Sequence, residues 1–229
     1  MSIKHSERAC SMESSKRCNP YVKVLPEEEI VISGISGRFP NSDNMKQLEE
    51  NLLNKMDLGS DDNRRWSPVH YDMPTRSGLI NHEQKFDAQF FNMTSSEAHA
   101  TDPMCRMLLE HTYEAIIDAG VNPKELRGTK TGVIIGSCYS ATRNIITFYR
   151  PDAAGYTFVG CSQYFLANSI SNWLGLNGPS YALDTACSSS HYAMAEAYRM
   201  IRSGECDAAI VGGANMCLHP YISLQFFQL

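Results

Sequence analysis

Three short apolar runs that end at or near glycine are the feature that most constrains how this chain can fold. They occupy residues 30–35, 131–135 and 208–213. Segments whose apolar residues recur at helical spacing lie between them, at 102–120 and 162–174. Short continuous apolar runs are typical of strands buried on both faces of a parallel sheet. The pattern therefore predicts an α/β fold in which helices cover a largely parallel sheet.

A fourth predicted strand leads directly into a tight turn and a helix. Residues 180–184 form the strand, residues 185–190 are small and polar, and a helix with one apolar side follows as far as Gly204. This strand, turn and helix contain Cys187. A residue on such a turn is exposed at the end of its strand and points at the N-terminus of the helix.

The rest of the chain is less regular. Residues 1–28 are polar and without pattern, which predicts a flexible tail before a domain over 29–229. Residues 45–56 predict a helix with one side packed inward, because apolar residues recur at three- and four-residue steps. Residues 59–92 predict a long irregular segment, and residues 152–160 predict a loop.

Composition and charge exclude several classes of function. The chain has 229 residues, of which 43% are hydrophobic, so it is long enough to bury a core. The net charge of -5, without blocks of like charge, argues against a nucleic-acid partner. No apolar run approaches the roughly 20 residues that cross a membrane, and no signal peptide is recognisable. We therefore expect a cytoplasmic location and no membrane partner.

The eight cysteines predict neither a disulfide framework nor a metal site. None forms a Cys-x-x-Cys pair, and no His-Glu-x-x-His sequence is present. In the cytosol these cysteines are expected to be reduced thiols. We expect no bound metal and no bound cofactor.

Cys187 is the candidate nucleophile. The N-terminus of a helix favours the thiolate, which is the strongest side-chain nucleophile near neutral pH. Its neighbours are alanine and serine, which let a backbone approach closely, and the Cys187 backbone N–H is a candidate oxyanion donor. The alternative is that Cys187 is a small core residue, since unpaired cysteine is among the most buried residue types.

The residues around Cys187 resemble the active-site segment of the β-ketoacyl synthases, the condensing domains of fatty acid and polyketide synthases. The similar segment is Asp184-Thr-Ala-Cys-Ser-Ser-Ser190, preceded by Asn177-Gly-Pro-Ser180. Three other segments resemble the family in the same order along the chain: Ile32–Pro40, Asp102–Arg106 and Gly204–Gly213. The resemblance implies a thiolase-like layered αβαβα fold, of which this chain supplies the first half only.

Within the family, the chain looks most like the ketosynthase domain of animal-type multifunctional fatty acid synthase. The segments that carry this likeness are Asp61–Trp66, Arg76–Gly78, Tyr113–Ala115 and Leu126–Thr129. The likeness implies an acyltransferase of fatty acid biosynthesis. Cys187 would take an acyl chain from the phosphopantetheine thiol of an acyl carrier protein, and malonyl carrier would then lose carbon dioxide and attack the thioester. It also implies a homodimer.

The sequence departs from the family at several positions. The two histidines that act beside the cysteine belong to the family's second half, and neither His191 nor His219 matches their motifs. Met104 and Cys105 replace the glutamine-containing part of an Asp-Pro-Gln-x-Arg segment, and Ser169 replaces an arginine. We therefore expect the isolated chain to be inactive in condensation.

Three alternatives remain open at this point. The first is a polyketide synthase ketosynthase, and the second is a truncated, non-catalytic paralogue that binds acyl groups or pairs with an intact synthase. The third is an incomplete gene product whose end at Leu229 has no biological meaning.

Overall fold

The computed structural model of the chain describes residues 2–4, 29–66, 74–143, 145 and 154–229. These residues form two compact units. The first unit contains the described residues of Met1–Ile35, Thr112–Cys138 and Gln163–Ala214. The second contains the described residues of Ser36–His111, Tyr139–Ser162 and Asn215–Leu229. The whole five-stranded sheet and Cys187 belong to the first unit.

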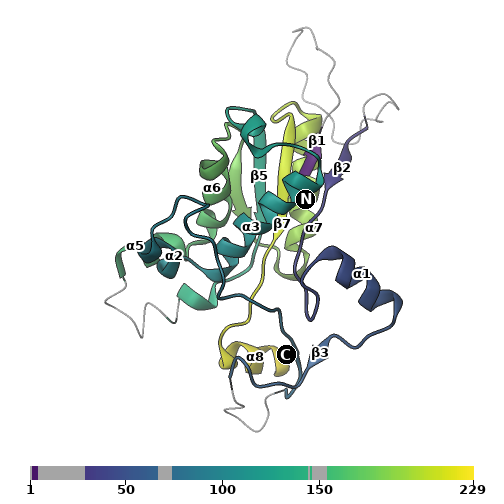
Figure 1. Ribbon diagram of the computed structural model, residues 1–229, viewed down its shortest axis with the longest axis vertical. Helices are drawn as coiled ribbons and strands as arrows, with labels where there is room; N and C mark the ends of the chain where they lie inside the picture. Colours follow the sequence, from purple (N-terminus) through teal and green to yellow (C-terminus); the bar gives the residue numbers. More distant parts are fainter. Residues whose placement is uncertain (1, 5–28, 67–73, 144, 146–153) are drawn as a thin grey trace. The chain divides into compact units, whose positions relative to one another are not determined.

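Strand β5 (Thr131–Gly136) lies in the parallel part of the sheet and confirms the predicted parallel arrangement (Figure 1). It is parallel to β6 (Ser180–Leu183) on one side and to β7 (Ala208–Gly213) on the other. All six residues of β5 are buried. A strand that is buried throughout must be covered on both faces, as its continuous apolar sequence predicts.

The other edge of the sheet consists of two antiparallel strands, in the order β2-β1-β7-β5-β6. Strand β1 (Ser2–Lys4) lies between β7 and β2 (Val31–Gly34) and is antiparallel to both. The sequence did not predict β1, because a polar tripeptide has no strand signature. The remainder of the predicted tail, residue 1 and residues 5–28, lies outside the described residues.

The predicted burial of the first apolar run is wrong. Val31 is 51% exposed and Ile32 is 50% exposed, because β2 is the edge strand and pairs only with the three residues of β1. Gly34 alone is buried in this strand. A Cβ on Gly34 would lie 2.1 Å from the carbonyl oxygen of Ala115, so only glycine fits there.

Helices α6 (Gln163–Leu174) and α7 (Ser189–Arg202) pack on the sheet, as predicted. The former contacts β5 and β6, and the latter contacts β5 and β7. Since β6 and β7 lie on opposite sides of β5, right-handed crossovers place the two helices on opposite faces. The core under α7 consists of small and branched side chains: Ile134, Ala193, Ala197, Met200, Ile201, Cys206, Ala209 and Val211.

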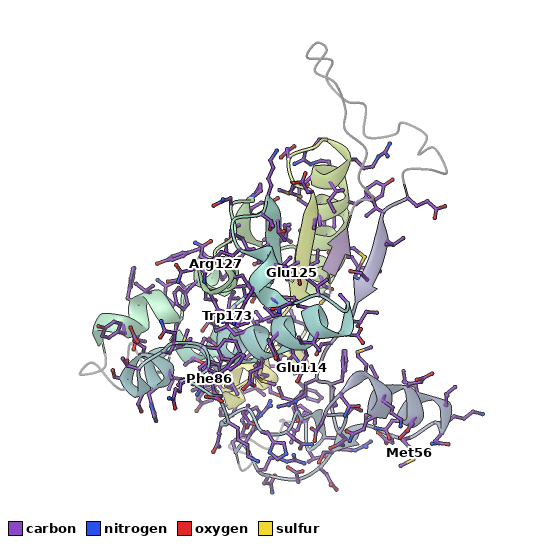
Figure 2. The ribbon with its side chains drawn as sticks, turned by 45° about the horizontal axis from the view of Figure 1, so that its top comes forward. Met56, Phe86, Glu114, Glu125, Arg127 and Trp173 are labelled. Atoms are coloured by element: carbon purple, nitrogen blue, oxygen red, sulfur yellow. The ribbon has the colours of Figure 1, made fainter. Side chains whose placement is uncertain are left out.

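Helix α3 (Pro103–Asp118) confirms the helix predicted over 102–120. It begins after Asp102, whose Oδ1 accepts a hydrogen bond of 2.8 Å from the Met104 backbone N–H. It is followed by Gly120 at a φ of 69°, a left-handed conformation that favours glycine. Trp173 of α6, labelled in Figure 2, makes an edge-to-face contact with Tyr113 of α3 at 6.4 Å between ring centroids.

The second unit contains shorter elements. They are α1 (Met45–Leu53), β3 (Gly59–Ser60), β4 (Ser77–Gly78), α2 (Ser95–Ala100), α5 (Ala154–Gly160) and α8 (Pro220–Phe227). Strands β3 and β4 form a two-residue antiparallel ladder within the segment predicted to be irregular. Phe86, labelled in Figure 2, stacks on Phe91 with 5.1 Å between ring centroids.

Two predictions about the second unit are wrong. Helix α1 exists, but none of its residues is buried: Leu52 is 62% exposed, and Met56, which follows the helix and is labelled in Figure 2, is 58% exposed. The predicted loop at 152–160 contains helix α5, which packs against α2. The carbonyl oxygen of Gly160, the last residue of α5, accepts a hydrogen bond of 3.0 Å from the Asp102 N–H, so a contact distant in sequence fixes this short helix.

Candidate active site at Cys187

Cys187 lies on a one-turn 3-10 segment, η4 (Ala186–Ser188), between β6 and α7. Its side chain is exposed. Because η4 follows the carboxyl end of β6 and continues directly into the 14-residue helix α7, the thiol is presented beside the first turn of that helix. This is the strand, turn and helix that the sequence predicts.

Short polar side chains hold the turn in place. The Ala186 backbone N–H donates a hydrogen bond of 2.8 Å to Asp184 Oδ1. Ser189 is 5% exposed, and its hydroxyl accepts from the Thr185 N–H at 3.0 Å and donates to the Ala186 carbonyl at 2.6 Å. These bonds hold the backbone that leads into Cys187 without involving the thiol.

The residue before Cys187 has a strained backbone. Ala186 has a φ of 53°, in the left-handed region that costs L residues roughly 1–2 kcal/mol. Such strain persists only where the surrounding structure enforces it, and it is concentrated at functional sites. The side chain of Ala186 is small, but the local sequence does not predict this left-handed conformation.

One backbone N–H at the turn, that of Cys187, is the candidate donor to a ligand. Ser188, the N-cap of α7, makes no side-chain cap, and its hydroxyl instead donates to the Thr185 carbonyl at 2.8 Å. Among the described residues, no acceptor bonds the Cys187 backbone N–H. An unpaired N–H beside a nucleophile is the geometry of an oxyanion donor.

Glycines at the ends of two strands let α7 approach the sheet at this point. A Cβ on Gly136 of β5 would lie 2.5 Å from the Ser189 carbonyl carbon, and a Cβ on Gly213 of β7 would lie 2.8 Å from Cβ of Ser190. The glycines that end the predicted strands therefore have a specific function. They place the first turn of α7 directly on the carboxyl ends of β5 and β7.

Two described histidines, His191 and His219, follow Cys187 in the sequence. His191 is exposed on α7, and the hydrogen bonds of the described residues do not join its ring to Cys187. His219 lies in the second unit, where its Nδ1 accepts from the Tyr221 N–H at 3.3 Å and caps α8. That neither histidine replaces those of the family's second half stays a prediction.

The three positions that depart from the family's pattern are buried. Met104 is 2% exposed and Cys105 is 0% exposed, both in α3. Ser169 is 6% exposed, and its hydroxyl donates to the Leu166 carbonyl at 3.3 Å within α6. These substitutions change the packing of two helices, while Asp102 still caps α3.

The described residues contain no group of three or more histidine, cysteine, aspartate or glutamate side chains that could hold a metal ion. In the same part of the chain, no helix is both long and apolar enough to cross a membrane.

Comparison with known proteins identifies the class of this fold and site. The β-ketoacyl synthase N-terminal domain matches residues 27–229, and the chain belongs to that family. The ketosynthase domain KS7 of oxazolomycin synthase from Streptomyces albus has a TM-score of 0.80 and 32% identity, over 87% of this chain and 37% of that chain. The module 6 ketosynthase of the Bacillus subtilis bacillaene synthase has a TM-score of 0.75 and 30% identity, over 86% of this chain and 34% of that chain. The fold is therefore the first part of a thiolase-like α/β fold.

Within the family, fatty acid synthase from the goose Anser anser anser is 45% identical over 202 residues. That match covers 88% of this chain and 57% of the goose sequence. The reducing polyketide synthase ppsB of Aspergillus oryzae is 36% identical over 85% of this chain and 8% of its own length. The chain thus spans little more than half of the length of the goose sequence and a much smaller part of the polyketide synthase.

Proposed function

We propose that this chain supplies the acyl-accepting half of a fatty acid synthase ketosynthase and that Cys187 is the acylated residue. The observation that carries the proposal is the exposed thiol on a strained turn at the N-terminus of α7. The 45% identity to goose fatty acid synthase supports the fatty acid branch over the polyketide branch.

In the proposed first step, the Cys187 thiolate attacks the carbonyl carbon of an acyl thioester, and the thiolate of the donor leaves. The donor is an acyl chain on the phosphopantetheine of a carrier protein, which binds as substrate. The Cys187 backbone N–H donates a hydrogen bond to the oxygen that becomes negative in the tetrahedral intermediate. One thioester replaces another, so the transfer is near thermoneutral.

In the proposed second step, malonyl carrier loses carbon dioxide and its carbanion attacks the Cys187 thioester. The new carbon–carbon bond forms as the Cys187 thiolate leaves. Decarboxylation and carbanion stabilisation require acid–base groups. We therefore propose that the isolated chain accepts an acyl group but does not condense it, and that condensation requires the remainder of a dimeric synthase.

The test measures acylation of Cys187. The chain is incubated with hexanoyl-N-acetylcysteamine, digested with trypsin and a protease that cuts before aspartate, and analysed by mass spectrometry. The digest yields Asp184–Arg199, whose one cysteine is Cys187. We expect a hexanoyl adduct on this peptide, its loss in Cys187→Ser, and its retention in the matched control Cys217→Ser. Equal acylation of several cysteines in wild type would contradict the proposal.

A polyketide ketosynthase is the second candidate, supported by the similarity to oxazolomycin and bacillaene ketosynthases. Comparing straight saturated with β-hydroxy and α-methyl acyl thioesters separates the two. Faster transfer of saturated chains supports the fatty acid branch. If no acyl thioester modifies Cys187 but the chain co-purifies with an intact synthase, a non-catalytic pairing function replaces both candidates.

A further inference from the structure

A second cysteine lies at the same edge of the sheet as Cys187. Cys138 follows β5 two residues after Gly136, and Cys187 follows β6 four residues after Leu183. Gly136 and Leu183 are paired in the parallel ladder between these neighbouring strands. Both cysteines therefore lie just beyond the carboxyl ends of two adjacent strands of the first unit.

The packing of α7 places both cysteines two residues from the same backbone contact, between Gly136 and Ser189. Gly136 lies against the backbone of Ser189, close enough that a Cβ would clash at 2.5 Å. Helix α7 connects the parallel strands β6 and β7, so it runs antiparallel to β5. Cys138 comes two residues after Gly136, and Cys187 comes two residues before Ser189. Because α7 and β5 run in opposite directions, both cysteines lie on the same side of the contact between Gly136 and Ser189.

Hydrogen bonds fix the backbone that leads to each thiol. The Ser137 N–H donates to the Leu183 carbonyl at 3.0 Å, and the Ser137 carbonyl accepts from Gln163 Nε2 at 3.0 Å. Adjacent strands lie about 4.8 Å apart. A disulfide requires Cα atoms roughly 4.4–6.8 Å apart, so the proposal requires the Cys138 and Cys187 turns to approach within about one strand spacing.

The third described cysteine of the first unit, Cys206, does not compete for Cys187. Cys206 belongs to the same unit, but it is 1% exposed and precedes β7, at the opposite edge of the sheet. Burial raises the pKa of the Cys206 thiol, which makes it unreactive. Cys138 is partly exposed and Cys187 is exposed, so an oxidant can reach both.

We propose that Cys138 and Cys187 form a reversible disulfide when the protein meets hydrogen peroxide, and that this bond protects and blocks the nucleophile. The Cys187 thiolate attacks one peroxide oxygen, forming a sulfenic acid and releasing hydroxide, which takes up a proton to become water. The Cys138 thiolate then attacks the sulfenic sulfur, forming the S–S bond and releasing hydroxide, which takes up a proton to become a second water. Two thiols are oxidised and one peroxide is reduced.

The test detects the cross-link directly and does not depend on catalysis. The full chain is treated with hydrogen peroxide, its remaining thiols are alkylated, and it is digested without reduction by trypsin and the aspartate-specific protease. The sole cysteine of Thr131–Arg143 is Cys138, and that of Asp184–Arg199 is Cys187. We expect these two peptides joined, with a mass 2 Da below their sum, in a protein that remains monomeric on a non-reducing gel.

The second measurement uses Cys138→Ser and, as a matched control, Cys217→Ser. In wild type and Cys217→Ser, peroxide should lower alkylation of Cys187 at least tenfold, and dithiothreitol should restore it. In Cys138→Ser the sulfenic acid has no partner, so dimedone should label Cys187 at least tenfold more than in wild type. Equal dimedone labelling of wild type and Cys138→Ser, or a cross-link from Cys187 to any other cysteine, would overturn the proposal.

Discussion

Gly136 and Ser189 are in backbone contact at the point where β5 ends and α7 begins. A Cβ on Gly136 would lie 2.5 Å from the Ser189 carbonyl carbon and 2.7 Å from its oxygen. Both of those atoms belong to the backbone of a helix, so a side-chain rotation cannot relieve the clash. This contact sets the height of the Cys187 turn above the sheet.

The first prediction follows from this contact. Gly136→Ala should destabilise the protein by about 2 kcal/mol or more, because it overpacks a rigid site, and it should slow alkylation of Cys187. Urea unfolding and peptide mass spectrometry measure the two effects. Gly132→Ala is the matched control in the same strand, since its Cβ would meet its nearest neighbour at an ordinary 3.4 Å. Equal effects of the two substitutions would show that the contact does not position the turn.

The second prediction concerns the left-handed conformation of Ala186. Ala186→Val should lower stability by about 1–2 kcal/mol, because a β-branched side chain at positive φ is disfavoured. Ala186→Gly should be neutral or stabilising, because glycine adopts this conformation without strain. The rate at which iodoacetamide alkylates Cys187 should fall in the valine variant and persist in the glycine variant. A valine variant as stable as wild type would show that the turn is not strained.

The third prediction is a pH dependence from Asp102. Burial raises the pKa of this carboxyl above its ordinary value, although hydrogen bonds from Ser140 and the Met104 N–H oppose the shift. The folded state then binds the proton more tightly than the unfolded state. The resulting stabilisation is complete below pH 3.8, the ordinary value, and is lost as the pH rises through the folded pKa.

Asp102→Asn removes the charge and keeps the cap on α3, so it should be more stable than wild type at pH 7 and closer to wild type at pH 4. Asp102→Ala also removes the cap and should be about 1 kcal/mol less stable than Asp102→Asn. Urea titrations at the two pH values measure these differences. A wild type more stable than Asp102→Asn at pH 7 would mean that the ionised carboxylate has stabilising partners.

The fourth prediction concerns solubility. Tyr221, Phe226 and Phe227 of α8 are each more than half exposed. Exposed apolar surface of this kind promotes association, so the recombinant chain should aggregate or require a partner. Replacing Phe226 and Phe227 by glutamine should raise the soluble fraction severalfold in size-exclusion chromatography, while the control pair Lys46→Gln and Glu50→Gln should not. A monodisperse, cooperatively melting wild-type monomer would contradict this prediction.

The structure of the first unit was predicted well from the sequence, because local sequence patterns and tertiary packing favour the same elements there. The glycine-ended apolar runs 131–135 and 208–213 became β5 and β7, and the helices between the strands ended at glycines with positive φ, Gly175 and Gly204. The strand, turn and helix around Cys187 was also correct. Whether Cys187 accepts an acyl group stays a prediction.

The errors have a common physical cause. Apolar periodicity shows that one side of a segment is apolar, but it does not show what covers that side. Thus Val31 and Leu52 were predicted to face inward and are exposed. Helix α5 was missed because seven residues with a glycine at the end have little intrinsic helix stability. Its contacts with α2 and Asp102 come from distant sequence.

The position of β5 between β6 and β7 determines when the Cys187 turn can be completed during synthesis. The chain makes β5 first, then β6 and the turn, and only afterwards β7, which pairs with β5 and helps to support α7. Until Gly213 has left the ribosome, one side of β5 is open and the first turn of α7 lacks half of its platform. Cys187 is therefore made before its surroundings are, and nascent chains that stop short of β7 carry this cysteine without the geometry that positions it.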